Sequence, residues 1–172
     1  MKQRRLVRLA LLVYAFVLVY FMFFGFGRLE RYSFFQYSLK IYSIPLWFPK
    51  MPSDAWRIWI FSVGNLAAFM PLGALIPASL SQAWRKYWKC LLLFLLGITA
   101  LELLQMLSLL GSFDVEDILV NTMGFSAGYA AWKFARRGKN AKKQLLLWCV
   151  AAFVLIWVCI GAAEVVNGLL GW

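Results

Sequence analysis

The chain has 172 residues, of which 63% are hydrophobic and 15% are charged, and its mean hydropathy is +0.74. Average globular chains are about 45–50% apolar and about 25% charged. A water-soluble domain of this length could not bury so much apolar surface, which predicts lipid as the surrounding solvent. The chain has no histidine, and this excludes Ser-His-Asp and Cys-His catalysis, His-ligated zinc and a histidine pH switch.

Long apolar runs recur along the whole chain. A helix needs about 20 mainly apolar residues to cross the hydrocarbon core of a membrane. The fourth run is the shortest, and its outer end is acidic. We therefore predict an all-α fold, a polytopic membrane helical bundle with about five transmembrane helices in one domain over residues 1–172. The runs cover residues 6–27, 58–80, 88–110, 118–134 and 145–170.

The first run has basic residues before it, as a secretory signal peptide does. Its apolar stretch is longer than the roughly 7–15 residues of a signal peptide. It ends in Phe23, Phe24 and Phe26, with no pattern of small residues for cleavage. We predict a retained anchor.

The formal charge of +11 would suggest nucleic acid in a soluble protein. With the N-terminus inside the cell, however, 13 of the 18 Lys and Arg residues fall in cytoplasmic segments, as the positive-inside rule requires. We predict this orientation and no nucleic-acid partner. The five basic residues outside are Arg28, Arg31, Lys40, Lys50 and Arg57.

Polar side chains inside the apolar runs are the informative ones, because burying them in lipid is costly unless they are paired. Glu102 and Gln105 are three residues apart and share a helix face. At about 1.5 Å per residue, the polar groups of three runs fall in the outer half of the membrane. The polar residues are Asn65, Glu102, Gln105, Asp114, Asp117 and Asn121, with Glu164 and Asn167 near the external end of the last run.

A stripe of polar and then small residues follows the third run. Its spacing of three and four residues places it on one helix face. Its small part is a G-x-x-x-G motif, which lets another helix approach closely. An acid near the start of this helix is favoured by the helix dipole. The stripe consists of Asp114, Asp117, Asn121, Gly124 and Gly128.

Each polar residue also has a structural interpretation. Asn65 could be a hydrogen-bond partner between helices, and Gln105 could pair with Glu102. Asp114 and Glu116 could be solvated turn residues, and Glu164 lies close to the surface. Glu102 is the hardest to explain this way, because no Lys or Arg in the runs is an obvious partner.

Segment 28–57 is the one long connection, rich in aromatic residues and proline. Aromatic side chains at head-group depth are ordinary anchors. The segment could be an interfacial loop or a short helix on the membrane, or a flap over a site in the external leaflet.

Three elements in this order resemble the VanZ-like family over about residues 60–130. The chain differs from the family where Gly111 and Ser112 replace a basic residue, and where Ile44-Pro45 stands for a longer N-L-x-P-F element. The elements are Asn65-Leu66-x-x-Phe69-x-Pro71-Leu72-Gly73, Glu102-x-x-Gln105, and Phe113-Asp114-x-x-Asp117-x-x-x-Asn121-x-x-Gly124-x-x-x-Gly128-Tyr129.

The resemblance implies a multi-pass protein of the bacterial plasma membrane and cell envelope. The namesake of the family is linked to resistance to the glycopeptide teicoplanin. Comparisons within the family also imply kinship with membrane enzymes that act on lipid head groups.

One hypothesis is an enzyme that acts on a lipid-linked head group at the external leaflet, either a polyprenyl-phosphate-linked precursor or a phospholipid. Glu102 would be the general acid or base, and Asp114 and Asp117 would orient a nucleophile or hold Mg²⁺ or Ca²⁺, which prefer oxygen ligands. Positive charge for a phosphate would come from a metal or from Arg57. The substrate-binding residues would be Asn65, Gln105 and Asn121.

Two alternatives use the same residues. These polar residues could together form a slot in the outer half of the membrane that binds a lipid head group or the tail of a lipid-like antibiotic without catalysis. The chain could also be a structural bundle whose polar residues satisfy one another. A transporter is a further option, but no inverted repeat is visible in the sequence.

Overall fold

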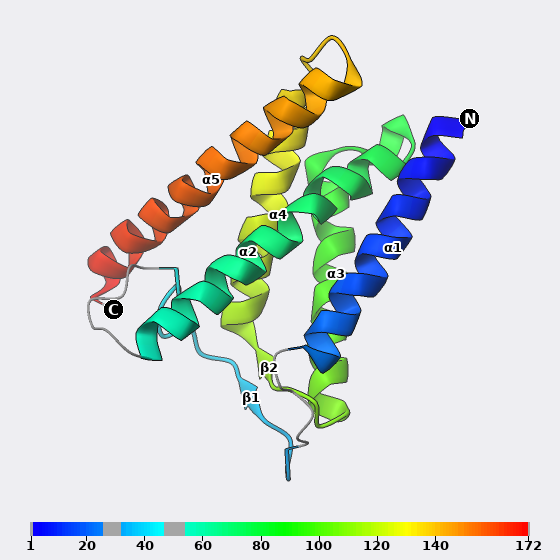
Figure 1. Ribbon diagram of the computed structural model, residues 1–172. Coiled ribbons are helices and arrows are strands. Elements are labelled where there is room, and N and C mark those ends of the chain that lie inside the picture. Colours follow the sequence, from blue (N-terminus) through cyan, green and yellow to red (C-terminus); the bar gives the residue numbers. More distant parts are fainter. Residues whose placement is uncertain (1, 26–31, 47–53, 172) are drawn as a thin grey trace. The chain divides into compact units, whose positions relative to one another are not determined.

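The computed structural model describes residues 2–25, 32–46 and 54–171, and the described part of the chain is mostly helical (Figure 1). This confirms the predicted all-α class. The long helices are α1 Lys2–Phe24, α2 Asp54–Ser79, α3 Tyr87–Leu107, α4 Val115–Ala135 and α5 Ala141–Leu170. The short elements are β1 Tyr37–Ser38, η1 Gln82–Trp84 and β2 Phe113–Asp114.

Four of these helices are long and apolar enough to cross a membrane. The fourth predicted span forms α4, which carries Glu116, Asp117 and Lys133 and is not among these four. The position of the N-terminus inside the cell stays a prediction. The candidate spans within the described residues are Arg4–Phe24, Trp56–Ser79, Tyr87–Leu107 and Ala141–Leu170.

The distribution of side chains is the reverse of that in a soluble protein. Large apolar side chains such as Phe16 and Leu96 are 73% and 64% exposed. Buried polar side chains include Ser62, Glu102 and Asn121. Such a surface is stable in hydrocarbon, where the polar groups face inward.

The chain divides into two compact units. The first unit consists of Met1–Ile41 and Leu75–Ile118, and the second of Tyr42–Ala74 and Leu119–Trp172.

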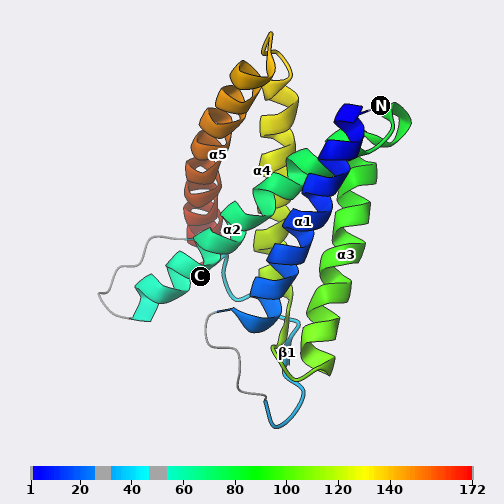
Figure 2. The same ribbon diagram turned by 45° about the vertical axis from the view of Figure 1, so that its right-hand side comes forward.

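In the first unit, α1 and α3 lie side by side (Figure 2). The Gln105 side chain of α3 donates a hydrogen bond of 2.7 Å from Nε2 to the Met22 carbonyl in the last turn of α1. Near the other end of α1, Arg8 Nε donates to the carbonyl of Ser79, 3.3 Å away. These two hydrogen bonds therefore hold both ends of helix α1 against the rest of the first unit.

The turn after α3 returns the chain toward β1. Leu110 N–H donates to the Gln105 carbonyl and Leu109 N–H to the Met106 carbonyl, which is the Schellman pattern of helix ends. This pattern places Leu109 at a φ of 60°, a position that usually favours glycine. Strand β2 then pairs in parallel with β1, with Tyr37 opposite Phe113 and Ser38 opposite Asp114.

In the second unit, the backbones of α2 and α4 touch. A Cβ at Gly124 would meet the backbone carbonyl of Leu66, and a Cβ at Gly128 would meet that of Met70. From the α2 side, a Cβ at Gly73 would meet the Phe125 carbonyl. The G-x-x-x-G motif therefore makes the close helix approach that the sequence predicts.

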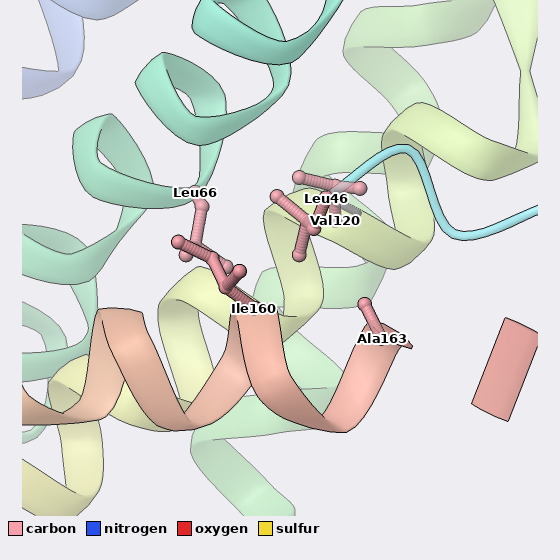
Figure 3. Packing of buried hydrophobic residues seen from close by; sticks show 5 residues of the cluster. All are labelled: Leu46, Leu66, Val120, Ile160 and Ala163. Atoms are coloured by element: carbon pink, nitrogen blue, oxygen red, sulfur yellow. The ribbon is translucent and has the colours of Figure 1, made fainter. Parts of the chain in front are cut away.

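The core of the second unit joins three helices and a loop segment. Leu66 of α2, Val120 of α4 and Ile160 of α5 point toward one another, and Leu46 and Ala163 complete the cluster (Figure 3). A second cluster joins the same helices through Met70, Ala127, Ala131 and Ala152. The loop residue Leu46 is fully buried, so the loop is part of this core.

Candidate functional site

Glu102 lies on the buried face of α3. Its side chain is 3% exposed, whereas the neighbouring Leu103 and Leu104 are 41% and 52% exposed. The carboxyl group therefore faces the protein and not the acyl chains, and it has an interaction partner. The buried face comprises Cys90, Phe94, Ile98, Glu102 and Gln105, at the spacing of one helical stripe.

Gln105 shares this face, but the partner of its amide lies in α1 and is not Glu102. Its amide donates to the Met22 carbonyl, one of the carbonyl groups that the last turn of a helix leaves without a partner. Water is absent from hydrocarbon, so a side chain has to satisfy such a group. Gln105 thus has a structural role at the end of α1, and its predicted part in substrate binding stays a prediction.

Asp114 precedes α4 and caps its first turn. Its Oδ1 accepts a hydrogen bond of 2.8 Å from the backbone N–H of Glu116. A carboxylate is favoured there by both the exposed N–H groups and the helix dipole. This geometry favours the interpretation of Asp114 as a turn residue, and its catalytic role stays a prediction.

Asp117 and Asn121 are one turn apart on α4, about 6 Å along its axis. Asp117 is half-buried, and Asn121 is 2% exposed. The carboxamide oxygen of Asn121 is buried without a hydrogen-bond partner, as is Thr122 Oγ1, and no other buried side-chain oxygen or nitrogen in the described residues shares this state. A buried acceptor in this state is costly, so it requires an explanation.

Asn65 lies on α2 near the point where this helix contacts α4. It precedes Leu66, whose carbonyl faces Gly124, and Asn121 precedes Gly124 by three residues. Each of the two amides therefore lies within one helical turn of the contact between Leu66 and Gly124 in the second unit. Glu102 and Gln105 share the buried face of α3 in the first unit. The prediction that both pairs meet in one slot stays a prediction.

The predicted Mg²⁺ or Ca²⁺ would need ligands besides side chains. Within residues 2–25, 32–46 and 54–171, no three Asp, Glu, Cys or His side chains gather closely enough to hold a metal ion. Mg²⁺ is commonly held by one or two carboxylates together with substrate phosphates. Asp114 already caps α4 and Asp117 also has an interaction partner, so the role of either acid as a metal ligand stays a prediction.

The long segment 28–57 lies partly outside the described residues, at 28–31 and 47–53. Of its described parts, 32–46 is a loop that contains β1 and no helix, and 54–57 form the first turn of α2. The predicted flap over a site stays a prediction.

Asn167 has a role that its sequence position does not reveal. Its Nδ2 donates to the carbonyl of Ile44 and its Oδ1 accepts from the N–H of Ile44, both at 2.9 Å. Trp59 Nε1 donates to the Leu46 carbonyl at 3.0 Å. These bonds hold Ile44-Pro45-Leu46 inside the second unit. The only sequence signal was an amide within the apolar end of the last run.

Asn167→Leu is expected to destabilise the protein by about 1–3 kcal/mol, because the half-buried N–H of Ile44 loses its partner and the Ile44 carbonyl keeps only its hydrogen bond from Leu46 N–H. The measurement is thermal unfolding of the purified protein in detergent, followed by tryptophan fluorescence. Gly168→Ala is the control, since nothing lies within 4 Å of a new Cβ there. Equal melting temperatures for the two variants would contradict the structural role of Asn167.

The comparisons with known proteins agree with the resemblance drawn from the motifs. The family model described as VanZ/LLP1 matches residues 11–136, which is most of the chain and extends beyond the 60–130 core of the motifs. Neither a curated protein nor a solved structure matches the chain. With its four apolar candidate spans and this match, the chain is a membrane protein that belongs to the VanZ/LLP1 family.

Proposed function

We propose that this VanZ-like protein resides in the bacterial plasma membrane and acts on a lipid-linked head group at the external leaflet. The observation that carries the proposal is the buried carboxamide oxygen of Asn121, which has no hydrogen-bond partner. A protein recovers the cost of such a group when a ligand supplies the missing donor. Asn121 therefore suits the binding of a substrate hydroxyl or amine.

The chemistry of the substrate follows from the polar groups along α2 and α4. The Asn121 amide would bind a hydroxyl of the head group, and Asn65, which also lies within one turn of the contact between α2 and α4, would bind a second polar atom. A phosphate in the substrate needs positive charge. The exposed Arg57 in the first turn of α2, or Mg²⁺ shared between Asp117 and the phosphate, would supply it. A polyprenyl-phosphate-linked precursor or a phospholipid fits these requirements.

Glu102 is the residue for proton transfer in this proposal. General acid or base catalysis needs a positioned side chain that can give up or take up a proton, and Glu102 is a carboxyl group on the buried face of α3. Transfer or hydrolysis of the head group would then use Glu102 to move the proton of the attacking hydroxyl or water. The reaction places the protein among lipid head-group transferases or hydrolases.

The second candidate function is a non-catalytic binder of a lipid head group or of a lipid-bearing antibiotic. Gln105 and Asp114 favour it, because both already make hydrogen bonds to the backbone and so have less capacity for chemistry. Reduced sensitivity to teicoplanin would follow from altered access of the drug to the cell surface.

Asn121→Leu tests the proposal, because leucine is close in volume and carries no amide. A strain that lacks the protein is complemented with the wild type or the variant, and its membrane lipids are compared by mass spectrometry. We expect the variant strain to accumulate the same lipid as the deletion strain. The variant should unfold at a temperature equal to or above that of the wild type, because no native hydrogen bond of the Asn121 oxygen is lost.

Two results would count against the proposal. Lipids of wild-type composition in the Asn121→Leu strain would show that this amide binds no substrate. A large fall in melting temperature and in membrane abundance would favour the structural bundle, in which the polar residues only hold helices together.

A further inference from the structure

The connection between α4 and α5 and the helix ends beside it carry the largest basic cluster of the described chain. We call residues 133–143 the basic turn. All of its Lys and Arg side chains are exposed, and the turn contains no acidic residue. The cations are Lys133, Arg136, Arg137, Lys139, Lys142 and Lys143.

The basic turn is electrostatically unfavourable by itself. Lys142 and Lys143 occupy the first turn of α5, which has no acidic residue. The positive end of the helix dipole lies there and favours anions over cations. An anion bound at this turn would relieve the repulsion among the lysines and between the lysines and the dipole.

The conformation of the basic turn is fixed by hydrogen bonds. Asn140 caps α5, because its Oδ1 accepts from the N–H of Lys143 at 2.9 Å. The Gln144 side chain donates to the Gly138 carbonyl at 2.9 Å. The cations are therefore carried by an ordered backbone and not by a loose linker.

Aromatic rings hold two of the cations. The guanidinium of Arg136 lies 5.3 Å from the ring centre of Trp132, and that of Arg137 lies 5.3 Å from the ring centre of Phe134. Such contacts orient a guanidinium without neutralising its charge. Tryptophan side chains such as that of Trp132 are enriched at the head-group level of a membrane.

We propose that the basic turn binds the phosphate of anionic phospholipid head groups. The turn leads directly into α5, a candidate span, so its cations lie where a membrane-spanning helix enters the lipid. Clusters of four to eight basic residues beside a span bind anionic lipids, each cation contributing about a fivefold gain in affinity. This lipid site follows the last turn of α4, whereas Asp117 and Asn121 lie in its first two turns. It is thus separate from the candidate substrate residues.

The test uses the purified full chain in a neutral detergent, where sidedness of the membrane has no influence. Phosphatidylglycerol and phosphatidylcholine with the same acyl chains are titrated, and binding is followed as the rise in melting temperature. We expect a rise with phosphatidylglycerol that weakens with salt, and little rise with phosphatidylcholine. Glycerol 3-phosphate is titrated as a soluble phosphate without a lipid tail. It should bind much more weakly than phosphatidylglycerol because it lacks the acyl chains.

Matched variants locate the site. Lys142→Gln with Lys143→Gln should weaken phosphatidylglycerol binding by about 30-fold, the effect of two cations. Lys86→Gln with Lys89→Gln removes the same charge from exposed positions at the start of α3, where only three cations gather, and should change binding less than about threefold. Lys142→Arg with Lys143→Arg should retain binding, which separates loss of charge from loss of fold.

Three outcomes would overturn the proposal. Equal weakening by the Lys86 and Lys89 pair would mean that net charge alone attracts the lipid. Equal affinity for glycerol 3-phosphate would make the turn a site for free phosphate. Tighter binding of a short RNA than of phosphatidylglycerol would make it a general polyanion site.

Discussion

Glu102→Gln is expected to leave the protein in the membrane at its normal level and to lower head-group conversion by about 10²- to 10⁴-fold. Glutamine keeps the shape of the side chain and can still form hydrogen bonds, but it cannot give up or take up a proton at working pH. The enzyme hypothesis assigns that proton transfer to Glu102 alone. The measurement is the rate at which membranes of the complemented strain consume the lipid that accumulates in the deletion strain.

Glu164→Gln is the matched control, because Glu164 is an exposed glutamate on α5 and undergoes the same chemical change. It should retain the wild-type rate. If Glu102→Gln also retains that rate, Glu102 is not the acid or base. The non-catalytic binder would then be the better hypothesis, provided that bulky residues at Asn65 or Asn121 still abolish the phenotype.

Gly128→Val is expected to destabilise the protein by about 3 kcal/mol or more, at the upper end of what overpacking costs. The first carbon of the new side chain would meet the Met70 carbonyl, and the Met70 Cα would lie 2.8 Å from it. On its other side, the Gly128 carbonyl accepts a hydrogen bond of 3.4 Å from Trp148 Nε1 of α5. Backbone atoms cannot move aside as a flexible side chain can, so α2 and α4 have to separate.

The thermal unfolding of Gly128→Val in detergent measures this effect. Gly161→Val on α5 is the control, because it adds the same β-branched side chain to a helix where nothing lies within 4 Å of the new Cβ. The control should lose only the small difference in helix propensity. A melting temperature for Gly128→Val close to that of Gly161→Val would contradict the close contact between α2 and α4.

The G-x-x-x-G motif shows what a local pattern can predict. Gly124 and Gly128 share one helix face because of their spacing alone, and the structure confirms that another helix approaches there. The sequence could not name α2 as that helix. Neither could it place Leu66 and Met70 at the contact, because these residues lie on a different run and contact depends on how the runs pack.

The polar residues show the limit of sequence reasoning for the candidate site. Gln105 finds its partner at Met22, 83 residues away, and Asn167 finds its partner at Ile44, 123 residues away. A carboxamide can bond to a backbone group, another side chain or a substrate with equal chemical suitability. Its residue type and depth therefore do not decide among these roles.

By itself the sequence determined the solvent of the protein and the positions of its helices, because apolar length and helical spacing are properties of neighbouring residues. It also determined that Glu102 and Gln105 share a face. Only the tertiary structure decided that Gln105 completes the end of α1, that Asp114 caps α4 and that the Asn121 oxygen has no partner. The physical reason is that a hydrogen bond requires two groups to meet within about 3 Å, and packing decides which groups meet.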